Sequence, residues 1–293
     1  MNAIRGAIVF ALLALNLILW GTLVLLLGLG KLVLSGRPRR ALTLTLARLG
    51  EQYVAGNELI LRTFLPSTRI DIEGVDGLMR DGHYLIISNH ISWVDIFVLF
   101  RTFHRRVALL RFFLKQELIW MPFLGLAAWA LEFPFMKRYE PEYLARHPEK
   151  RGTDLATTRR ACQRYRTIPV AILNFIEGTR FSREKQADED SPYRYLLRPR
   201  VGGVAFVLAS LGDQLDGIID VTIAYPGHDI DMWDFVTGRV PQVRVRVRKL
   251  EVPAEFYDEA IAEPGPQREH FKLWVEKVWR EKDELLADLT QLA

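Results

Sequence analysis

The sequence has a single cysteine, Cys162, in 293 residues. One thiol excludes an internal disulfide framework and a cysteine-based zinc cluster. The chain also lacks a glycine-rich phosphate loop, a dinucleotide-binding fingerprint, internal repeats and low-complexity tracts. Only one apolar run is long enough to cross a bilayer, which excludes a transporter with many spans. With 49% hydrophobic and 25% charged residues, the chain is too apolar for a disordered protein.

The excess positive charge is confined to the N-terminal part of the chain. The net charge is +4, from 39 Lys and Arg against 35 Asp and Glu. Residues 1–64 hold seven basic and two acidic side chains, a net charge of +5, and the remainder sums to −1. Because the bulk of the chain is close to neutral, no nucleic acid partner is predicted. Basic residues beside an apolar segment instead favour contact with anionic lipid.

The one long apolar run extends from Gly6 to Gly30 without a charged residue. At about 1.5 Å per residue in a helix, it is long enough for a bilayer core of about 30 Å. A cleaved signal peptide would have a shorter apolar core and a small-residue cleavage site, so we predict a segment that stays in the membrane. Four basic residues follow the run and only Arg5 precedes it. The positive-inside rule then predicts that the rest of the chain is cytoplasmic.

Residues 41–64 form a second N-terminal element. Apolar residues recur there at helical spacing with charged residues between them, which predicts an amphipathic helix in the interface or packed along the first helix. Whether the pair spans the bilayer or dips into it is left open. The chain is therefore divided into a membrane-associated helix pair, residues 1–64, and a cytoplasmic domain, residues 65–293.

After Pro66, short apolar strands alternate with helical stretches, the pattern of an α/β sheet covered by helices. Strands are expected at Arg69–Glu73, Tyr84–Ser88, Val107–Leu110, Phe133–Met136, Val170–Asn174, Asp220–Ala224 and Val243–Val247. Helices are expected at Trp93–Phe103, Phe123–Ala130, Thr153–Tyr165, Val201–Leu211, Phe256–Ala262 and Gln267–Leu289. Residues 183–191 are predicted to be a polar loop. The arginines that alternate with valines in residues 243–248 predict a half-buried edge strand whose charges block pairing.

The first segment with candidate catalytic residues is SNHISWVD, residues 88–95, at the end of a buried strand. Active groups in such sheets lie at the carboxyl ends of strands. Asp95, about one helical turn past the start of the next helix, is placed to reach back to the His90 imidazole, fix its tautomer and raise its basicity. His90 can then take a proton from a hydroxyl. Alone, the pair fits a structural histidine beside a helix start equally well.

The second segment is AILNFIEGTR, residues 171–180, again a strand that ends in a tight turn. Gly178 lets the backbone bend close to a ligand. Arg180 presents a planar fork suited to a phosphate, and Glu177 is expected to brace that arginine or to bond a substrate. Alone, this segment also fits an ordinary turn with a surface ion pair.

Together the two segments resemble the glycerophospholipid acyltransferases, the family of PlsC-like 1-acylglycerol-3-phosphate acyltransferases. The pattern N-H-x-S-x-x-D of that family is matched at Asn89, His90, Ser92 and Asp95. The pattern F-P-E-G-T-R is matched at residues 175–180, except that Ile176 stands where Pro is usual. This variant, with the long N-terminal segment, resembles the bacterial branch related to lysocardiolipin-type acyltransferases.

Two weaker blocks agree with the family in order and spacing. FPFMKR, residues 133–138, resembles a block that ends in a substrate-contacting basic residue, here Arg138. VTIAYP, residues 221–226, resembles an apolar strand that ends in proline. Lys115 stands where the family often has a lysine. The resemblance covers residues 66–226.

The resemblance implies a mixed, largely parallel sheet flanked by helices. It also implies transfer of a fatty acyl group from acyl-CoA or acyl-carrier protein to the free hydroxyl of a lysophospholipid. The first acceptor to consider is 1-acyl-sn-glycerol-3-phosphate, which would give phosphatidate, and the alternative is another lysolipid in phospholipid remodelling. In this resemblance His90 is the general base and Asp95 orients it. The substrate-binding residues are Glu177, Gly178, Thr179, Arg180, Arg138 and Lys115.

Backbone amides near the helix start at His90 are expected to stabilise the oxyanion. No metal and no organic cofactor is implied, and the expected partners are the lysophospholipid, the acyl thioester and the bilayer. The implied location is the bacterial inner (cytoplasmic) membrane, with the catalytic domain facing the cytoplasm. A catalytically inactive lipid-binding scaffold is an alternative of another class, which the intact His90–Asp95 pair disfavours. A hydrolase is disfavoured because the chain has no Gly-x-Ser-x-Gly elbow.

Overall fold

The computed structural model describes residues 2–136, 146, 153–227 and 230–291. Its main sheet has the strand order β1-β8-β7-β2-β6-β3. These strands are β1 Arg69–Glu73, β2 His83–Ser88, β3 Leu110–Phe112, β6 Val170–Phe175, β7 Gly217–Ala224 and β8 Gln242–Leu250. Neighbouring strands run parallel except β7 and β8, which are antiparallel. The prediction of a mixed, largely parallel sheet is confirmed.

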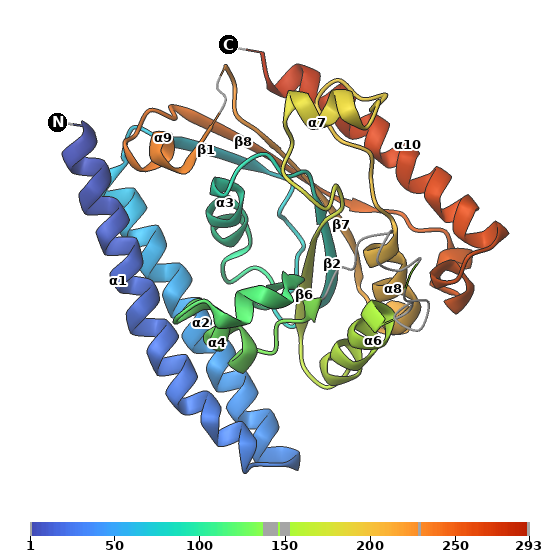
Figure 1. The fold of residues 1–293 in the computed structure, drawn as a ribbon, viewed down its shortest axis with the longest axis horizontal. Helices are drawn as coiled ribbons and strands as arrows, with labels where there is room; N and C mark the ends of the chain where they lie inside the picture. Colours follow the sequence, from blue (N-terminus) through green and yellow to red (C-terminus); the bar gives the residue numbers. More distant parts are fainter. Residues whose placement is uncertain (1, 137–145, 147–152, 228–229, 292–293) are drawn as a thin grey trace.

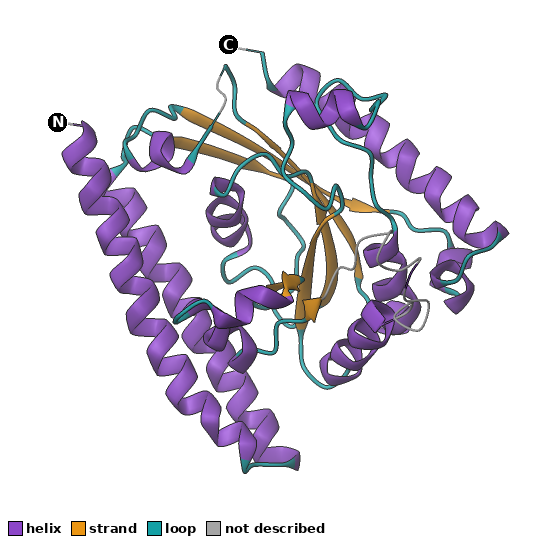
Figure 2. Ribbon diagram, in the orientation of Figure 1, coloured by secondary structure: helices purple, strands orange, loops and turns teal. Residues whose placement is uncertain are grey.

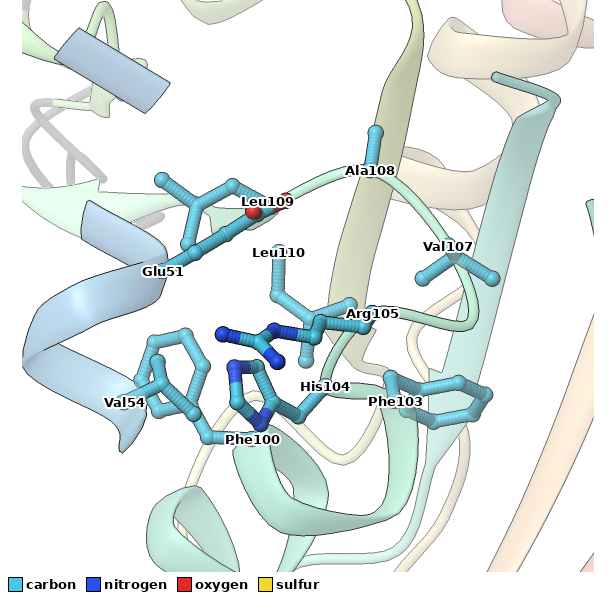
Figure 3. A pocket seen from close by; sticks show the side chains of 10 residues that line it. All are labelled: Glu51, Val54, Phe100, Phe103, His104, Arg105, Val107, Ala108, Leu109 and Leu110. Atoms are coloured by element: carbon cyan, nitrogen blue, oxygen red, sulfur yellow. The ribbon is translucent and has the colours of Figure 1, made fainter. Parts of the chain in front are cut away.

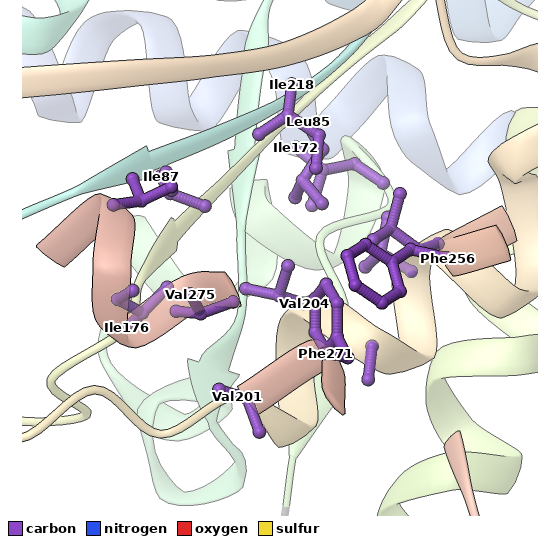
Figure 4. Packing of buried hydrophobic residues seen from close by; sticks show 14 of the residues in the cluster. Leu85, Ile87, Ile172, Ile176, Val201, Val204, Ile218, Phe256, Phe271 and Val275 are labelled. Atoms are coloured by element: carbon purple, nitrogen blue, oxygen red, sulfur yellow. The ribbon is translucent and has the colours of Figure 1, made fainter. Parts of the chain in front are cut away.

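Helices cover both faces of this sheet (Figures 1 and 2). One face carries α6 Thr153–Tyr165, α8 Gly202–Leu211 and α10 Pro266–Leu289, and the other carries α3 Val94–Phe103 and the N-terminal helices. Leu85 and Ile172 pack toward α8 and α10 (Figure 4), whereas the next residue of β2, Ile86, packs toward α3. Side chains alternate between the faces along a strand, so continuously apolar strands fill two cores.

The N-terminal helices lie side by side and antiparallel (Figure 1). They are α1 Asn2–Gly28 and α2 Gly36–Phe64, joined through a 3₁₀ turn, η1 Leu29–Leu32. The Asn16 amide of α1 donates to the carbonyl of Tyr53 and to Oδ1 of Asn57, each at 2.9 Å. Asn2–Leu32 is the one stretch of the described chain that is long and apolar enough to cross a membrane.

Both ends of α1 also contact the rest of the chain. Near its start, Arg5 donates to the carbonyl of Thr237, just after α9 Met232–Val236. At the other end, Gly28 packs so closely on α4, Leu124–Ala130, that a Cβ there would lie 2.5 Å from the Ala130 side chain. Helix α1 therefore lies along the α/β domain and does not project from it.

The arginines of β8 lie in an interior strand, because β8 is between β1 and β7. Arg246 forms ion pairs with Asp71 and Glu73 of β1, both at 3.0 Å. Arg248 pairs with Asp220 of β7 at 2.9 Å. The prediction of an edge strand is therefore wrong, because β8 lies between two strands. Arg246 and Arg248 are paired with carboxylates of these neighbours, and Arg248 also pairs with Glu281 of α10 at 2.9 Å.

Three local expectations also need correction. Strand β3 starts at Leu110, later than expected, and the residues before it form a turn. The expected polar loop contains a short helix, α7 Arg183–Asp188, because the Ser182 hydroxyl caps it by accepting from the Lys185 amide. Residues 254–262 form 3₁₀ turns where a helix was expected. The remaining short elements are β4 Leu114–Lys115 paired with β5 Phe135–Met136, η2 Gln116–Trp120, η4 Gly212–Gln214, η5 Ala254–Tyr257 and η6 Glu259–Ala262.

Candidate active site

The segments 88–95 and 171–180 meet because β2 and β6 are adjacent parallel strands. Their last residues are paired, Ser88 with Phe175. The loops that follow therefore leave the sheet side by side at its carboxyl edge, where α/β proteins bind ligands. They are also bonded directly, since the Phe181 amide donates to the His90 carbonyl at 2.7 Å.

His90 and Asp95 form the expected pair. Nδ1 of His90 lies 2.8 Å from Oδ2 of Asp95. The same oxygen accepts from the amides of Ile91 at 2.6 Å and Ser92 at 2.9 Å, because Asp95 lies in the first turn of α3 and faces the preceding loop. A carboxylate only accepts, so Nδ1 carries the hydrogen and Nε2 is left as a proton acceptor.

Tyr225, directly after β7, also forms a hydrogen bond with Asp95. Its hydroxyl donates to Oδ1 of Asp95 at 2.6 Å, and both side chains are buried. Burial and the neighbouring Asp95 carboxylate raise the pKa of Tyr225 well above its ordinary value, so the hydroxyl stays protonated and keeps donating. The motif at residues 221–226 predicted no role for Tyr225. Only the position of β7 beside β2 brings it here.

The His90 ring is also held by packing. It stacks on Phe175, with ring centroids 3.9 Å apart and planes 15° from parallel. The His90 side chain is only 13% exposed. Stacking and the bond to Asp95 together leave the ring one orientation, as a base aimed at a bound hydroxyl requires.

Glu177 ties the two loops to each other. Oε1 accepts from the His90 amide at 2.9 Å, and Oε2 accepts from the Leu197 amide at 3.0 Å. The expected brace between Glu177 and Arg180 is therefore wrong, because both oxygens are engaged by backbone amides. Burial raises the pKa of Glu177 to about 8. A proton on this carboxyl would weaken the bond at the oxygen that carries it, while the other oxygen would still accept.

Helix α10 also bonds to the Leu197 segment that Glu177 contacts. Trp279 is fully buried, and its indole N–H donates to the carbonyl of Leu197 at 2.9 Å. The peptide of Leu197 therefore connects α10 to Glu177, and Glu177 connects it to the backbone of His90. The apolar stripe of α10 that contains Trp279 packs in the core.

Arg180 and Lys185 place two cations on the loop after β6. The exposed Arg180 guanidinium lies 5.1 Å from the centroid of the Trp93 ring. Lys185 of α7 donates to the Thr179 hydroxyl at 2.8 Å and to the Arg180 carbonyl at 3.0 Å. Gly178 has φ +74° and packs on Arg200, a turn that disfavours any larger residue. Lys185 was not among the predicted substrate-binding residues, because residues 183–191 were expected to form a polar loop.

Arg138 and Lys115 are the two remaining expected substrate-binding residues. Arg138 lies outside the described residues. Lys115 is exposed on β4, in the separate two-stranded sheet, and within the described ranges no hydrogen bond or ion pair links it to either loop.

The expected oxyanion donors are engaged elsewhere. The amides of His90, Ile91 and Ser92 all donate to carboxylates, so these three amides are not free to stabilise an oxyanion. In the part of the chain that the structure describes, no group of three or more His, Cys, Asp or Glu side chains is placed to hold a metal ion.

Comparison with known proteins identifies the family. The family model described as Acyltransferase matches residues 69–226, more than half of the chain and all the residues of both loops. This chain belongs to the glycerophospholipid acyltransferase family. The resemblance drawn from residues 88–95 and 171–180 is thereby confirmed, and the protein is an acyltransferase of the PlsC and lysophospholipid group.

Named relatives of the acyltransferase differ in their acceptors. Lysocardiolipin acyltransferase 1 of Gallus gallus is 27% identical over 229 residues, which cover 72% of this chain and 55% of the relative. The 1-acyl-sn-glycerol-3-phosphate acyltransferase epsilon of Mus musculus is 23% identical over 262 residues, which cover 80% of this chain and 66% of the relative. The chain thus spans about half to two thirds of these relatives.

A solved structure has the same fold as this acyltransferase. The 1-acyl-sn-glycerophosphate (LPA) acyltransferase PlsC from Thermotoga maritima superposes with a TM-score of 0.54 over 97% of each chain, at 16% sequence identity. The match extends beyond residues 69–226, so the N-terminal helices and the C-terminal β8 and α10 belong to the shared fold.

Proposed function

We propose that this acyltransferase moves a fatty acyl group from acyl-CoA or acyl-carrier protein to the free hydroxyl of 1-acyl-sn-glycerol-3-phosphate. The observation that carries the proposal is the Nε2 atom of His90, a proton acceptor fixed by Asp95, on a loop that is bonded through the Phe181 amide to the loop that carries Arg180. A lysolipid phosphate held by Arg180 and Lys185 would bring its hydroxyl to the imidazole. Another lysolipid in phospholipid remodelling is the second candidate, supported by the named lysocardiolipin relatives.

In the proposed reaction no side chain becomes acylated. Nε2 of His90 takes the proton of the acceptor hydroxyl as its oxygen attacks the thioester carbonyl carbon. The ester C–O bond forms, the C–S bond breaks, and the imidazolium returns the proton to the leaving thiolate. Asp95 stabilises the imidazolium while the proton is held there. Cys162 is buried in the core, and its burial raises the pKa of the thiol to about 12, so it is unsuited to act as a nucleophile. The proposal uses no metal and no organic cofactor.

Arg180→Ala is expected to raise the KM for lysophosphatidate by about 10-fold to 100-fold, because one charge-assisted contact with the phosphate is lost. The KM for the thioester should stay within about twofold. Steady-state kinetics in mixed micelles, with either substrate varied, measures both. Arg183→Ala removes an exposed arginine of α7 and is the matched control. A raised thioester KM with an unchanged acceptor KM would assign Arg180 to the donor instead.

We further propose that α1 lies in one face of the bacterial inner membrane, with the catalytic domain on the cytoplasmic side. Helix α1 contacts the domain near both ends, so a helix crossing the whole bilayer would draw α4 and α9 in with it. The face of α1 turned away from the protein is apolar, with Leu19 and Leu26 about 60% exposed. Trp120 in η2, next to α4, is 85% exposed. Such a surface is suited to the boundary between headgroups and acyl chains.

The double variant Leu19→Glu and Leu26→Glu is expected to lower binding to phosphatidylglycerol-containing vesicles by at least about tenfold. Each substitution replaces a leucine whose burial is worth about 2 kcal/mol with a charge. Vesicle flotation measures the bound fraction. Leu273→Glu on α10 is the matched control, because Leu273 is 63% exposed and α10 lies on the opposite side of the sheet (Figure 1). Equal binding of the double variant and the control would place the membrane contact on another surface.

A further inference from the structure

A hollow lies at the edge of the sheet opposite the edge that carries His90. Its volume is about 370 Å³, and it separates α2 from the loops that lead into β2, β3 and β6. Strand β2 runs from this edge to the active-site edge, and six residues at about 3.3 Å each put roughly 20 Å between the two. A smaller hollow adjoins it and shares Glu51, Ala108 and Leu109 with it (Figure 3). The larger volume suits a small ligand.

Arg111 of β3 lies in the inner wall of this cavity. It is 1% exposed, its Nε donates to the Leu131 carbonyl at 2.9 Å, and its guanidinium lies 5.6 Å from the centroid of the Tyr165 ring. Nη1 has no hydrogen-bond partner among the described residues. A buried charged donor without an acceptor costs free energy that a bound anion would recover.

The carboxylate near Arg111 is already engaged by other cations. Glu132 lies 3.1 Å from Nζ of Lys31 and 3.6 Å from the Arg39 guanidinium. Lys31 also donates to the Ala130 carbonyl at 2.7 Å. Two cations therefore share this one carboxylate, and among the described residues no carboxylate forms an ion pair with Arg111.

The mouth of the cavity carries two more guanidinium groups. Arg80 pairs with Glu51 of α2, and Arg48 is exposed one turn earlier on the same helix. Asp81 is the other acidic residue of the lining, so arginines outnumber carboxylates around the cavity. Apolar side chains, among them Leu44 and Ile168, complete the wall. Several guanidinium groups around an apolar-walled hollow match a ligand with more than one anionic oxygen.

We propose that this cavity binds a phosphate group, with Arg111 at its inner end and Arg48 and Arg80 at its mouth. The phosphate belongs either to a soluble metabolite or to a lipid headgroup that reaches α2 from the membrane. A bound phosphate would join α2 to the sheet edge, because the three arginines come from α2, β3 and the loop before β2. The proposal does not depend on the reaction proposed above.

The test is thermal unfolding of the full-length protein in an uncharged detergent, titrated with sodium phosphate against sodium chloride at equal ionic strength. We expect phosphate to raise the unfolding midpoint by about 2–4 °C at saturation, because a ligand bound to the folded state stabilises it by mass action. In Arg111→Met this rise is lost, and the comparison is made relative to the variant's own midpoint without phosphate, because the substitution also removes the bond to the Leu131 carbonyl.

Three further variants keep the result interpretable. Ala47→Leu narrows the cavity from α2, retains every arginine and should also abolish the rise. If Arg111→Met fails to fold, Ala47→Leu still tests whether phosphate binds in this cavity. Arg180→Ala should keep the full rise, which separates this site from the proposed acceptor site. Arg160→Gln, an exposed position on α6, should keep it as well.

The same variants in nanodiscs of phosphatidylcholine, with and without phosphatidylglycerol, distinguish the two sources of phosphate. A rise with phosphatidylglycerol that soluble phosphate does not produce assigns a lipid headgroup, and a rise with soluble phosphate assigns a metabolite. The absence of any rise in both media would overturn the proposal. An equal rise in wild type, Arg111→Met and Ala47→Leu would also overturn it, because the phosphate would then bind elsewhere.

Discussion

Replacing His90 with alanine is expected to lower kcat by about 10²–10⁴-fold, the contribution of a positioned general base. The structure gives a specific reason for the loss. Asp95 holds Nδ1 of His90 at 2.8 Å, so Nε2 is the atom left to take the proton of the acceptor hydroxyl. Alanine removes this acceptor and leaves the Asp95 bonds to Ile91 and Ser92 in place. Thiol release from acyl-CoA, with and without lysophosphatidate, measures the effect.

His270→Ala is the matched control for this experiment, because His270 is an exposed histidine on α10. Its kcat should equal that of wild type. The unfolding midpoint of His90→Ala should fall by no more than a few degrees, since the His90 backbone bonds to Glu177 and Phe181 remain. Full acceptor-dependent activity in a folded His90→Ala enzyme would contradict the mechanism. No thiol release by wild type with any lysolipid or either type of donor would favour the scaffold alternative.

Asp95→Asn is expected to lower kcat by at least about 10²-fold with little loss of stability. The asparagine carbonyl can accept from His90, Ile91 and Ser92 as Oδ2 of Asp95 does now. Its NH₂ then faces the Tyr225 hydroxyl, which can rotate from donor to acceptor. The bonding pattern is thus preserved, while the negative charge that stabilises the imidazolium is lost.

Tyr225→Phe is the comparison that isolates the charge. It removes one neutral hydrogen bond to Asp95 and keeps the carboxylate, so kcat should fall only about twofold to tenfold. Steady-state kinetics and thermal unfolding of the two variants in parallel provide the measurement. If Asp95→Asn loses no more activity than Tyr225→Phe, the carboxylate charge does not contribute, and Asp95 serves only to orient the ring.

The contacts of this site that lie within one short segment could be predicted from the local sequence. His90 and Asp95 are five residues apart across a helix start, so their contact follows from the geometry of one turn. The turn at Gly178 follows from the residue type in the same way. The carboxyl ends of β1, β2, β5 and β7 were also placed correctly, because each is a short apolar run that ends at a polar residue or turn.

Contacts that depend on strand order were not predicted. Tyr225 reaches Asp95 only because β7 lies beside β2, and Glu177 reaches the His90 amide only because β6 lies on the other side of β2. The arginines of β8 were misassigned for the same reason. Alternating charges look the same at the edge of a sheet as in an interior strand whose neighbours carry the matching carboxylates. A single sequence does not specify which strands are neighbours in the sheet.

The position of β8 has a consequence for how the chain assembles during translation. Within the described residues, strand β1 pairs in the sheet only with β8, Arg69 opposite Gln242, and Arg5 in α1 bonds to Thr237. These earlier segments therefore wait for partners that the ribosome makes much later. Such distant pairings are slow to form and leave apolar surface uncovered meanwhile. For α1 a bilayer would cover that surface, so early insertion would protect the nascent chain from aggregation until β8 emerges.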